Sequence, residues 1–471
     1  MSVNLNEDTV RNPQDTDVRG VLETLQGNIL QAHGRDYAVY LFLQFTEEVS
    51  RVREVLSSYL PRIVTSAAKQ FDDARKFASS KVDGGLFATF FLSAAGYRYL
   101  GFTNAQLKAL LPEPSGGQGF RSNFIEGMKA HASELRDPDP KDERLEAGYK
   151  EEIHALLLLA HDDQSWVKQA ERSSRDALAG IARVVVAEDG YAPRDENLQA
   201  YEHFGFADGI SQPVFLQKDA DASRPAAWNP VEPLSLVLVE DGAAPVAGVY
   251  GSFFVFRKLE QDVRGFAERT AELAKTLRVS PEQVGAKAVG RFRDGTPLAV
   301  AQASGTGAVN DFVYGATTAC PMHAHIRKAN PRGDFAPTIG FTEEVAERSH
   351  RIVRRGIPYG DRPKKPFQPQ SIAEMPTAGV GILFGCYQAS IANQFAFIQS
   401  RWLNRVDFPQ DRVGIDPITG SQQAGSANDW GAAPDRHEVR ENFGQFVTFK
   451  GGEFFFAPSI PFLGVLAPVS R

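Results

Sequence analysis

The sequence predicts an α+β protein made of two ferredoxin-like domains packed together. In the first half of the chain, apolar runs of strand length alternate with stretches of helical spacing, and the same alternation returns in the second half. A polar, proline-containing stretch at 217–233 lies between the halves and is the best linker candidate. We therefore expect an N-terminal domain at 1–220 and a C-terminal domain at 221–471.

The individual elements follow from local patterns. In the first half, strand signals lie at 37–45, 86–92, 155–160 and 182–187, and helical spacing at 47–60 and 162–179. In the second half, a strand at 251–256 leads into a helix at 259–277, and a strand at 381–387 leads into a helix at 391–402. Residues 111–144 are charged and carry several Pro and Gly, which predicts a long surface insertion.

Composition excludes some classes of function. Hydrophobic residues make up 42% of the chain and charged residues 23%, close to the average of soluble globular proteins. Phenylalanine is unusually frequent, with 33 residues against 4 Met and 4 Trp, which indicates large aromatic cores or a flat apolar cofactor pocket. The net charge of −7 argues against nucleic acid as a partner, because no basic surface would neutralise phosphates.

Cysteine usage and the N-terminus bear on location. Cys320 and Cys386 are too few for a disulfide framework and lack metal-site spacing. The segment 1–8 is polar and acidic without an apolar signal core, so we expect a cytoplasmic protein, with secretion by a non-classical route left open. The longest aliphatic run, 155–160, is too short to span a bilayer, so no membrane association is expected.

The first chemical motif is an aspartate bracketed by glycines, Gly205-x-x-Asp208-Gly209. An ordinary Asp-Gly turn would explain it equally well. In the functional interpretation, the glycines let the backbone approach a flat cofactor closely while the carboxylate projects over it. Asp208 could then take a proton from hydrogen peroxide and return it to the departing oxygen.

A histidine and an arginine follow in chain order. His325 is a candidate axial ligand for haem iron, but His323 competes with it, since both would share one face of an extended segment. Arg354 carries a permanent charge that could stabilise negative charge as a peroxide bond breaks. An Arg-Arg pair such as Arg354-Arg355 is more often a solvated face. A carboxylate, a histidine and an arginine in this order are the components of a haem peroxidase site.

Taken together, the segments 203–211, 320–332 and 354–360 resemble the dye-decolourising peroxidases. The similarity extends over essentially the whole chain. Within the family, the chain most resembles the larger bacterial and fungal subfamilies. The resemblance implies a barrel-like dimeric α+β arrangement of the two domains. It also implies one haem b per chain, bound in the C-terminal half.

The resemblance assigns roles to particular residues. It selects His325 over His323 as the iron ligand, because the family's ligand precedes a basic run and an Asn-Pro-Arg sequence, as His325 does here. It aligns Arg354 with the distal arginine. It offers Asp416, in the segment 416–420, as the carboxylate partner of the ligand, although an Asp-Pro turn explains Asp416 almost as well.

Further residues complete the expected site. The resemblance implies that Ile382 and Phe384 roof the distal pocket, while Leu383 would point elsewhere if the segment is a strand. Arg327 would reach a haem propionate. The resemblance and the chemistry of aromatic side chains also nominate two possible electron relays for bulky donors. These are Tyr359, near Arg354 in sequence, and Trp402.

The expected activity is that of a haem b peroxidase. It would use hydrogen peroxide to oxidise dyes, phenols and other aromatic donors in one-electron steps through an oxoferryl intermediate. The alternative is a haem-handling or iron-releasing protein, and an inert ligand-binding protein also stays open if the motifs are coincidental. The sequence does not distinguish a monomer from a homodimer. It names neither the physiological donor nor any manganese oxidation, and it does not decide whether Asp208 or Arg354 dominates peroxide cleavage.

Overall fold

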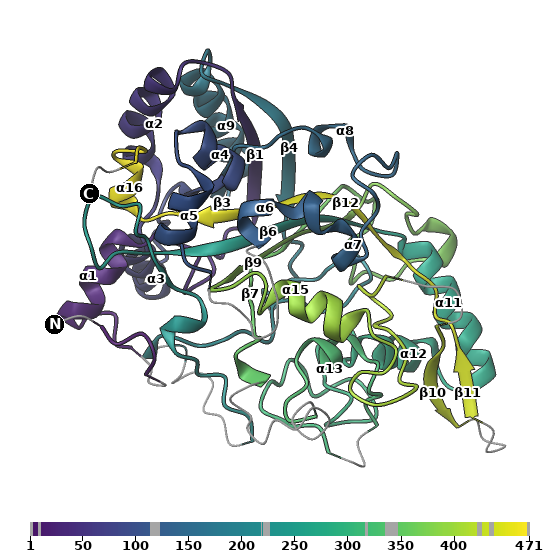
Figure 1. Ribbon diagram of the computed structural model, residues 1–471. Helices are drawn as coiled ribbons and strands as arrows, with labels where there is room; N and C mark the ends of the chain where they lie inside the picture. The colour runs from purple at the N-terminus through teal and green to yellow at the C-terminus, as the bar shows by residue number, and fades with distance from the viewer. Residues whose placement is uncertain are drawn as a thin grey trace.

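The computed structural model of the chain is shown in Figure 1. It describes residues 3–7, 11–113, 123–217, 219, 227–315, 319–334, 347–421, 426–432 and 438–468. Of the predicted linker, residues 218 and 220–226 lie outside the described residues, as do 114–122 of the predicted insertion. Among the described residues, no helix combines the length and the apolar character needed to cross a membrane.

The first half forms a four-stranded antiparallel unit in the order β2-β3-β1-β4. Its elements are β1 (Tyr37–Phe45), α2 (Val49–Ile63), α3 (Ala67–Ser80), β2 (Phe87–Ser93), β3 (Ala155–His161), α9 (Gln164–Leu178) and β4 (Ala182–Tyr191). β1 is apolar throughout because both of its faces are buried. Val39 and Leu41 pack in one core cluster, and Tyr40 and Phe42 in another. This is the strand order of a ferredoxin-like fold.

The second half repeats this arrangement. Its main elements are β6 (Tyr250–Gln261), α11 (Val263–Leu277), α12 (Pro281–Val289), β7 (Val353–Arg354), β8 (Ile357–Tyr359), β9 (Gly381–Gln388) and β12 (Val447–Ala457). β6 pairs with β12 on one side and with β9 on the other, and β9 in turn pairs with β7 and β8. The two predicted ferredoxin-like units are therefore confirmed as a fold class, and the domain boundary near residue 220 stays a prediction.

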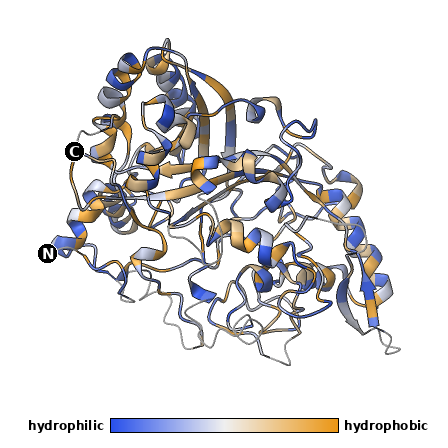
Figure 2. Cartoon of the chain, in the orientation of Figure 1, coloured by the Kyte–Doolittle hydropathy of each residue, from blue (hydrophilic) through white to orange (hydrophobic). Residues whose placement is uncertain are grey.

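The two units join edge to edge into one closed sheet. β12 pairs with β2 through Phe455 and Phe456, and β4 pairs with β8 through Gly190 and Tyr359. The pairing of β6 with β9 closes the ten-stranded sheet into a barrel. Figure 2 shows apolar residues along these central strands. Much of the phenylalanine content fills the barrel, where Phe91 stacks on Phe254 with ring centroids 4.6 Å apart.

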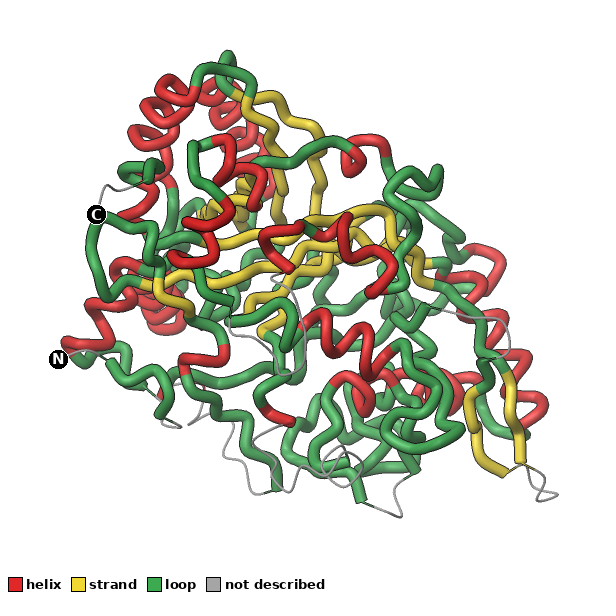
Figure 3. The backbone as a smooth tube through the Cα atoms, viewed as in Figure 1, coloured by secondary structure: helices red, strands yellow, loops and turns green. Residues whose placement is uncertain are grey.

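Shorter elements decorate the barrel. They are α1 (Thr16–Thr24), α4 (Ala94–Tyr99), α5 (Asn104–Leu110), α6 (Asn123–Glu126), η1 (Met128–His131), α7 (Ala132–Leu135), α8 (Ala147–Lys150), η2 (Leu234–Leu236), β5 (Val239–Glu240), α13 (His325–Ala329), η3 (Ile372–Glu374), α15 (Phe395–Phe397), the π-helical turn η4 (Ile398–Leu403), β10 (Asn428–Ala432), β11 (Glu438–Glu441) and α16 (Ile460–Leu463). Figure 3 shows that long loops make up much of the region below the barrel.

The segment 111–144 is not simply a surface insertion. Phe124, Met128 and Leu135 are buried in the core cluster that covers the outside of the barrel. Its frequent charges and prolines predicted exposure, but the short helical turns α6 and η1 lie against β12 and place Phe124 and Met128 there.

Candidate active site

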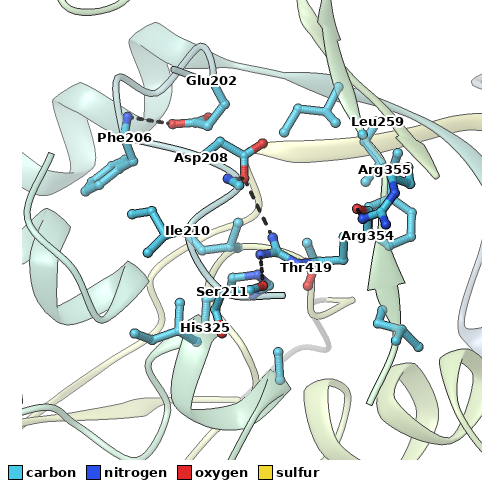
Figure 4. A pocket seen from close by; sticks show the side chains of 18 of the residues that line it. Glu202, Phe206, Asp208, Ile210, Ser211, Leu259, His325, Arg354, Arg355 and Thr419 are labelled. Carbon is cyan, nitrogen blue, oxygen red and sulfur yellow. Dashed lines mark hydrogen bonds and ion pairs between the residues drawn. The ribbon is translucent and has the colours of Figure 1, made fainter. Parts of the chain in front are cut away.

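A cavity of about 790 Å³ lies between the outer face of the barrel and the loops of the second half. It is lined by side chains from both halves, including Asp208, His325 and Arg354. Figure 4 shows these three residues facing the same space. The three sequence motifs are thus brought together by the fold, although about a hundred residues separate the first from the second.

The aspartate lies on a tightly held loop that follows β4. Gly205 and Gly209 have φ angles of +92° and +77°, conformations that favour glycine. Glu202 fixes the loop from within, because its carboxylate accepts hydrogen bonds from the backbone N–H groups of Phe204 at 2.9 Å and Phe206 at 2.8 Å. The Gln261 amide donates a third at 2.6 Å. Burial raises the pKa of Glu202, and these hydrogen bonds oppose that shift.

Asp208 and Arg354 form the polar pair of the cavity. The guanidinium Nη1 lies 3.6 Å from Asp208 Oδ1, and Nη2 donates to the backbone oxygen of Ser211 at 3.0 Å. Their side chains are 30% and 37% exposed, so both are accessible from the cavity. Arg355 differs, because its guanidinium donates to the backbone oxygens of Asn28 and Ile29. Burial lowers the pKa of Arg355 to about 10.

His325 is the first residue of α13, and a buried carboxylate holds its ring. Nδ1 lies 2.8 Å from Asp416 Oδ2, which leaves Nε2 as the ring nitrogen available to the cavity. The other oxygen of Asp416 accepts the N–H groups of Ile418 at 2.8 Å and Thr419 at 2.7 Å. Burial alone would raise the pKa of Asp416. The imidazole of His325 and these hydrogen bonds outweigh it and hold the pKa below its usual value.

His323 lies outside the cavity lining. It is 1% exposed and packs against Trp430, with ring centroids 4.6 Å apart. Burial lowers the pKa of His323 to about 3. The sequence pattern could not choose between His323 and His325 as the ligand, because an extended segment would place both side chains on one face. Since α13 begins at His325, the two side chains do not share a face.

The strand β9 presents the expected pair of apolar side chains. Ile382 and Phe384 line the cavity, whereas Leu383 is fully buried on the barrel side. The alternation expected of a strand is therefore present. Gly209 lines the same cavity, and a Cβ atom at this position would have nothing within 4 Å.

Arg327 is not among the residues that line the cavity. Its Nε and Nη2 pair with Asp334 at 2.5 and 3.0 Å, and Nη1 donates to the backbone oxygen of Cys320. Two other buried arginines, Arg332 and Arg351, line the cavity instead. Within the described part of the chain, Nε of Arg332 and both Nε and Nη2 of Arg351 have no hydrogen-bond partner. The sequence feature that points to Arg332 is the Asn-Pro-Arg motif that it ends, shortly after His325.

The two expected relay residues are buried and not at the surface. Trp402 is 2% exposed and stacks on Phe408, with ring centroids 5.4 Å apart. Tyr359 is 7% exposed, and the Lys258 ammonium lies 4.8 Å from its ring centroid. The Tyr359 hydroxyl has no hydrogen-bond partner among the described residues. A bulky donor therefore cannot touch Trp402 directly in this conformation.

Known proteins match this chain over nearly its whole length. Residues 24–192 match a family model described as the DyP dimeric alpha+beta barrel domain, and residues 203–422 match the C-terminal model of Dyp-type peroxidases. The chain is 37% identical to the multifunctional dye peroxidase DyP2 of Amycolatopsis sp., covering 94% of this chain and 95% of that one. It is 28% identical to a dye-decolorizing peroxidase of Mycena epipterygia, covering 95% and 87%. A crystal structure of a DyP-type peroxidase from Anabaena sp. superposes with a TM-score of 0.87 at 39% identity, covering 98% of each chain.

The Glu202 carboxylate is expected to be essential for the geometry of the loop that carries Asp208. Glu202→Ala leaves three buried donors without an acceptor, so the free energy of unfolding should fall by about 2–4 kcal/mol. Denaturant unfolding measures this change. Glu196→Ala, at an exposed position nearby, is the matched control and should change stability by no more than about 0.5 kcal/mol. Similar small effects for both variants would show that Glu202 does not hold the loop.

Proposed function

Because the chain belongs to the Dyp-type peroxidase family and is a peroxidase, we propose that it binds one haem b per chain in this cavity. We propose further that it uses hydrogen peroxide to oxidise dyes, phenols and other aromatic donors in one-electron steps. The observation that carries the proposal is the placement of Asp416–His325 and Asp208–Arg354 around a single cavity.

The residues present fit a haem group. One imidazole backed by a carboxylate faces the cavity, and in the part of the chain that the structure describes no three His, Cys, Asp or Glu side chains gather as a site for a bare metal ion. A metal that brings its own macrocycle needs only one protein ligand. Ile382, Phe384 and the open space at Gly209 suit a flat apolar ring. The unpartnered nitrogens of Arg332 and Arg351 suit its carboxylates.

When bound, haem would supply the iron that reacts with peroxide and takes up electrons from the donor. In this proposal His325 Nε2 would bind the iron, and Asp416 fixes the tautomer and orientation of the imidazole ring. Arg332 and Arg351 replace Arg327 as the candidates for the propionate contacts, because they line the cavity and keep unpartnered nitrogens. The Arg327 guanidinium lies outside the lining and pairs with Asp334.

Asp208 and Arg354 divide the work on peroxide. The Asp208 carboxylate accepts a proton from hydrogen peroxide and returns it to the departing oxygen, which leaves as water. The Arg354 guanidinium stabilises the negative charge that develops as the O–O bond breaks. Its bond to the Ser211 backbone oxygen keeps it directed into the cavity. Haem carriage without turnover is not favoured, because the relatives over nearly the whole chain are named as peroxidases.

A donor too large for the cavity would deliver electrons from the surface. We propose Tyr359 and Trp402 as intermediate positions on such a route and not as the surface contacts themselves, since both are buried. Tyr359 is favoured by its position on β8, directly after the strand that carries Arg354.

The assignment of the ligand is tested by replacing each histidine. His325→Ala should lose haem or its normal visible spectrum, because the cavity-facing imidazole that Asp416 holds is removed. His323→Ala is the matched control and should retain both. Haem stoichiometry and the absorption spectrum of the purified variants give the result, and the reverse pattern would overturn the assignment.

The assignments on the peroxide side are tested by stopped-flow spectroscopy. Asp208→Asn and Arg354→Leu should each slow the reaction with peroxide by roughly 10²–10³-fold while haem is retained. The two losses should not add in the double variant if the pair acts together. A severe loss in Arg354→Leu with little change in Asp208→Asn would assign the main role to the arginine and reject the aspartate as the base.

The relay proposal separates large from small donors. Tyr359→Phe or Trp402→Phe should lower the steady-state rate with a multi-ring dye, because phenylalanine does not form a stable radical, and leave small-phenol oxidation nearly intact. The rate of reaction with peroxide should not change. Equal losses on both donors, together with a lower unfolding temperature, would show that these rings only pack in the core.

A further inference from the structure

We propose that Leu198 forms an apolar lip at the mouth of the cavity, against which neutral, single-ring aromatic donors dock. The proposal rests on the proposed function and names the donor class for that same site. Leu198 lines the cavity together with Arg35, Arg194 and Tyr201, and the residue is 72% exposed.

The backbone of Leu198 is strained. Its φ angle is +64°, a conformation that is unfavourable for a branched, bulky side chain. Eight described non-glycine residues have positive φ, and four of them line the cavity: Asn28, Arg136, Leu198 and Arg332. Strain of this kind is known to concentrate at functional sites.

The other three have local explanations. Asparagine tolerates this conformation, Arg136 ends helix α7, and the Arg332 side chain is buried among hydrogen-bond partners. An exposed leucine gains nothing comparable from packing in the free protein. A contact made only when a donor is bound would explain why an apolar side chain stands there.

A dense set of hydrogen bonds imposes this conformation. The Leu198 N–H donates to the backbone oxygen of Asp195 at 3.1 Å, and Arg194 Nη1 donates to the Leu198 oxygen at 3.0 Å. The Asp195 carboxylate accepts the N–H groups of Asn197 at 2.9 Å and Gln199 at 3.0 Å. The turn is therefore rigid, and it directs the leucine outward.

The same turn is tied to the loop that carries Asp208. Gln199 Nε2 donates to the Asp208 backbone oxygen at 2.9 Å, and the Asp208 N–H donates to the Ala200 oxygen at 2.9 Å. Tyr201 forms an antiparallel bridge with Ala207. The lip thus keeps a fixed position relative to the proposed catalytic carboxylate, as a substrate-positioning element requires.

The charges at the mouth select the donor class. Arg35 pairs with Asp162 at 2.8 Å and with Asp83 at 3.2 Å, and Arg194 pairs with Asp36 at 2.6 Å. Because carboxylates already neutralise both guanidinium groups, these two arginines offer no surplus positive charge to a sulfonate. What remains for a ligand is the leucine side chain and the ring of Tyr201, which suit a neutral ring.

The test compares two variants and two donors on the haem-loaded protein. Leu198→Asn removes the apolar contact but tolerates the left-handed backbone. The KM for 4-methoxyphenol should rise roughly three- to tenfold, with kcat and the peroxide dependence unchanged. The KM for anionic 4-hydroxybenzenesulfonate should not rise. The matched control is Val246→Asn, which alters an exposed valine that does not line the cavity. This variant should leave the KM values for both donors unchanged.

Two readouts do not depend on turnover. Calorimetric binding of 4-methoxyphenol without peroxide should weaken by the same factor in Leu198→Asn. The unfolding temperature of that variant should rise by about 1–2 °C, because the strain is relieved. Unchanged KM and unchanged binding would overturn the proposal, and an equal rise for both donors would overturn the selection of neutral rings. If the wild-type protein oxidises neither donor, the proposed function fails, while the binding experiment still decides whether the lip exists.

Discussion

The pairing of β4 with β8 is the contact on which the active-site geometry depends. It joins the edge of the first ferredoxin-like unit to the second, with Gly190 opposite Tyr359. The chain that leaves β4 carries Asp208, and the chain that enters β8 carries Arg354, so this one strand pairing brings the two residues together. Two further bonds reinforce it: His203 Nε2 lies 2.8 Å from the Tyr359 backbone oxygen, and the Arg354 N–H donates to Gln212 Oε1. The site exists only because the two halves form one closed barrel.

The sequence predicted what depends on local pattern and missed what depends on distant pairing. The strand at 37–45 coincides with β1, and alternation correctly directed Ile382 and Phe384 away from Leu383. Pattern alone could not show that the edges of the two units pair, because edge strands carry no signal for their partner. Nor could it choose between His323 and His325, since that choice depends on where α13 begins. The resemblance chose the histidine that the cavity contains.

Arginine side chains place positive charge in the walls of the cavity. Arg291, Arg332 and Arg355 all line it, and burial lowers the pKa of each to about 10, which still leaves all three charged at neutral pH. Most of their hydrogen bonds go to backbone oxygens and not to carboxylates. Positive charge in the walls is therefore only partly compensated by the protein. A dicarboxylate cofactor would complete that compensation, whereas the guanidinium groups at the mouth are already paired with aspartates.

Loops carry part of the site, and one recurrent hydrogen-bond arrangement makes those loops rigid. A carboxylate accepts two backbone N–H groups from the residues that follow it: Asp195 from residues 197 and 199, Glu202 from 204 and 206, and Asp416 from 418 and 419. Each of these turns positions one part of the site, namely the lip, the proposed base and the partner of the proposed iron ligand. Asp416 does both tasks at once, since one oxygen closes its own turn and the other holds the imidazole of His325. In these loops preorganisation therefore comes from side-chain to backbone hydrogen bonds, whereas α13 and β7 hold His325 and Arg354. This explains why the periodicity of the sequence located the barrel but not the turns that hold Asp208 and Asp416, which lie in the loops between its elements.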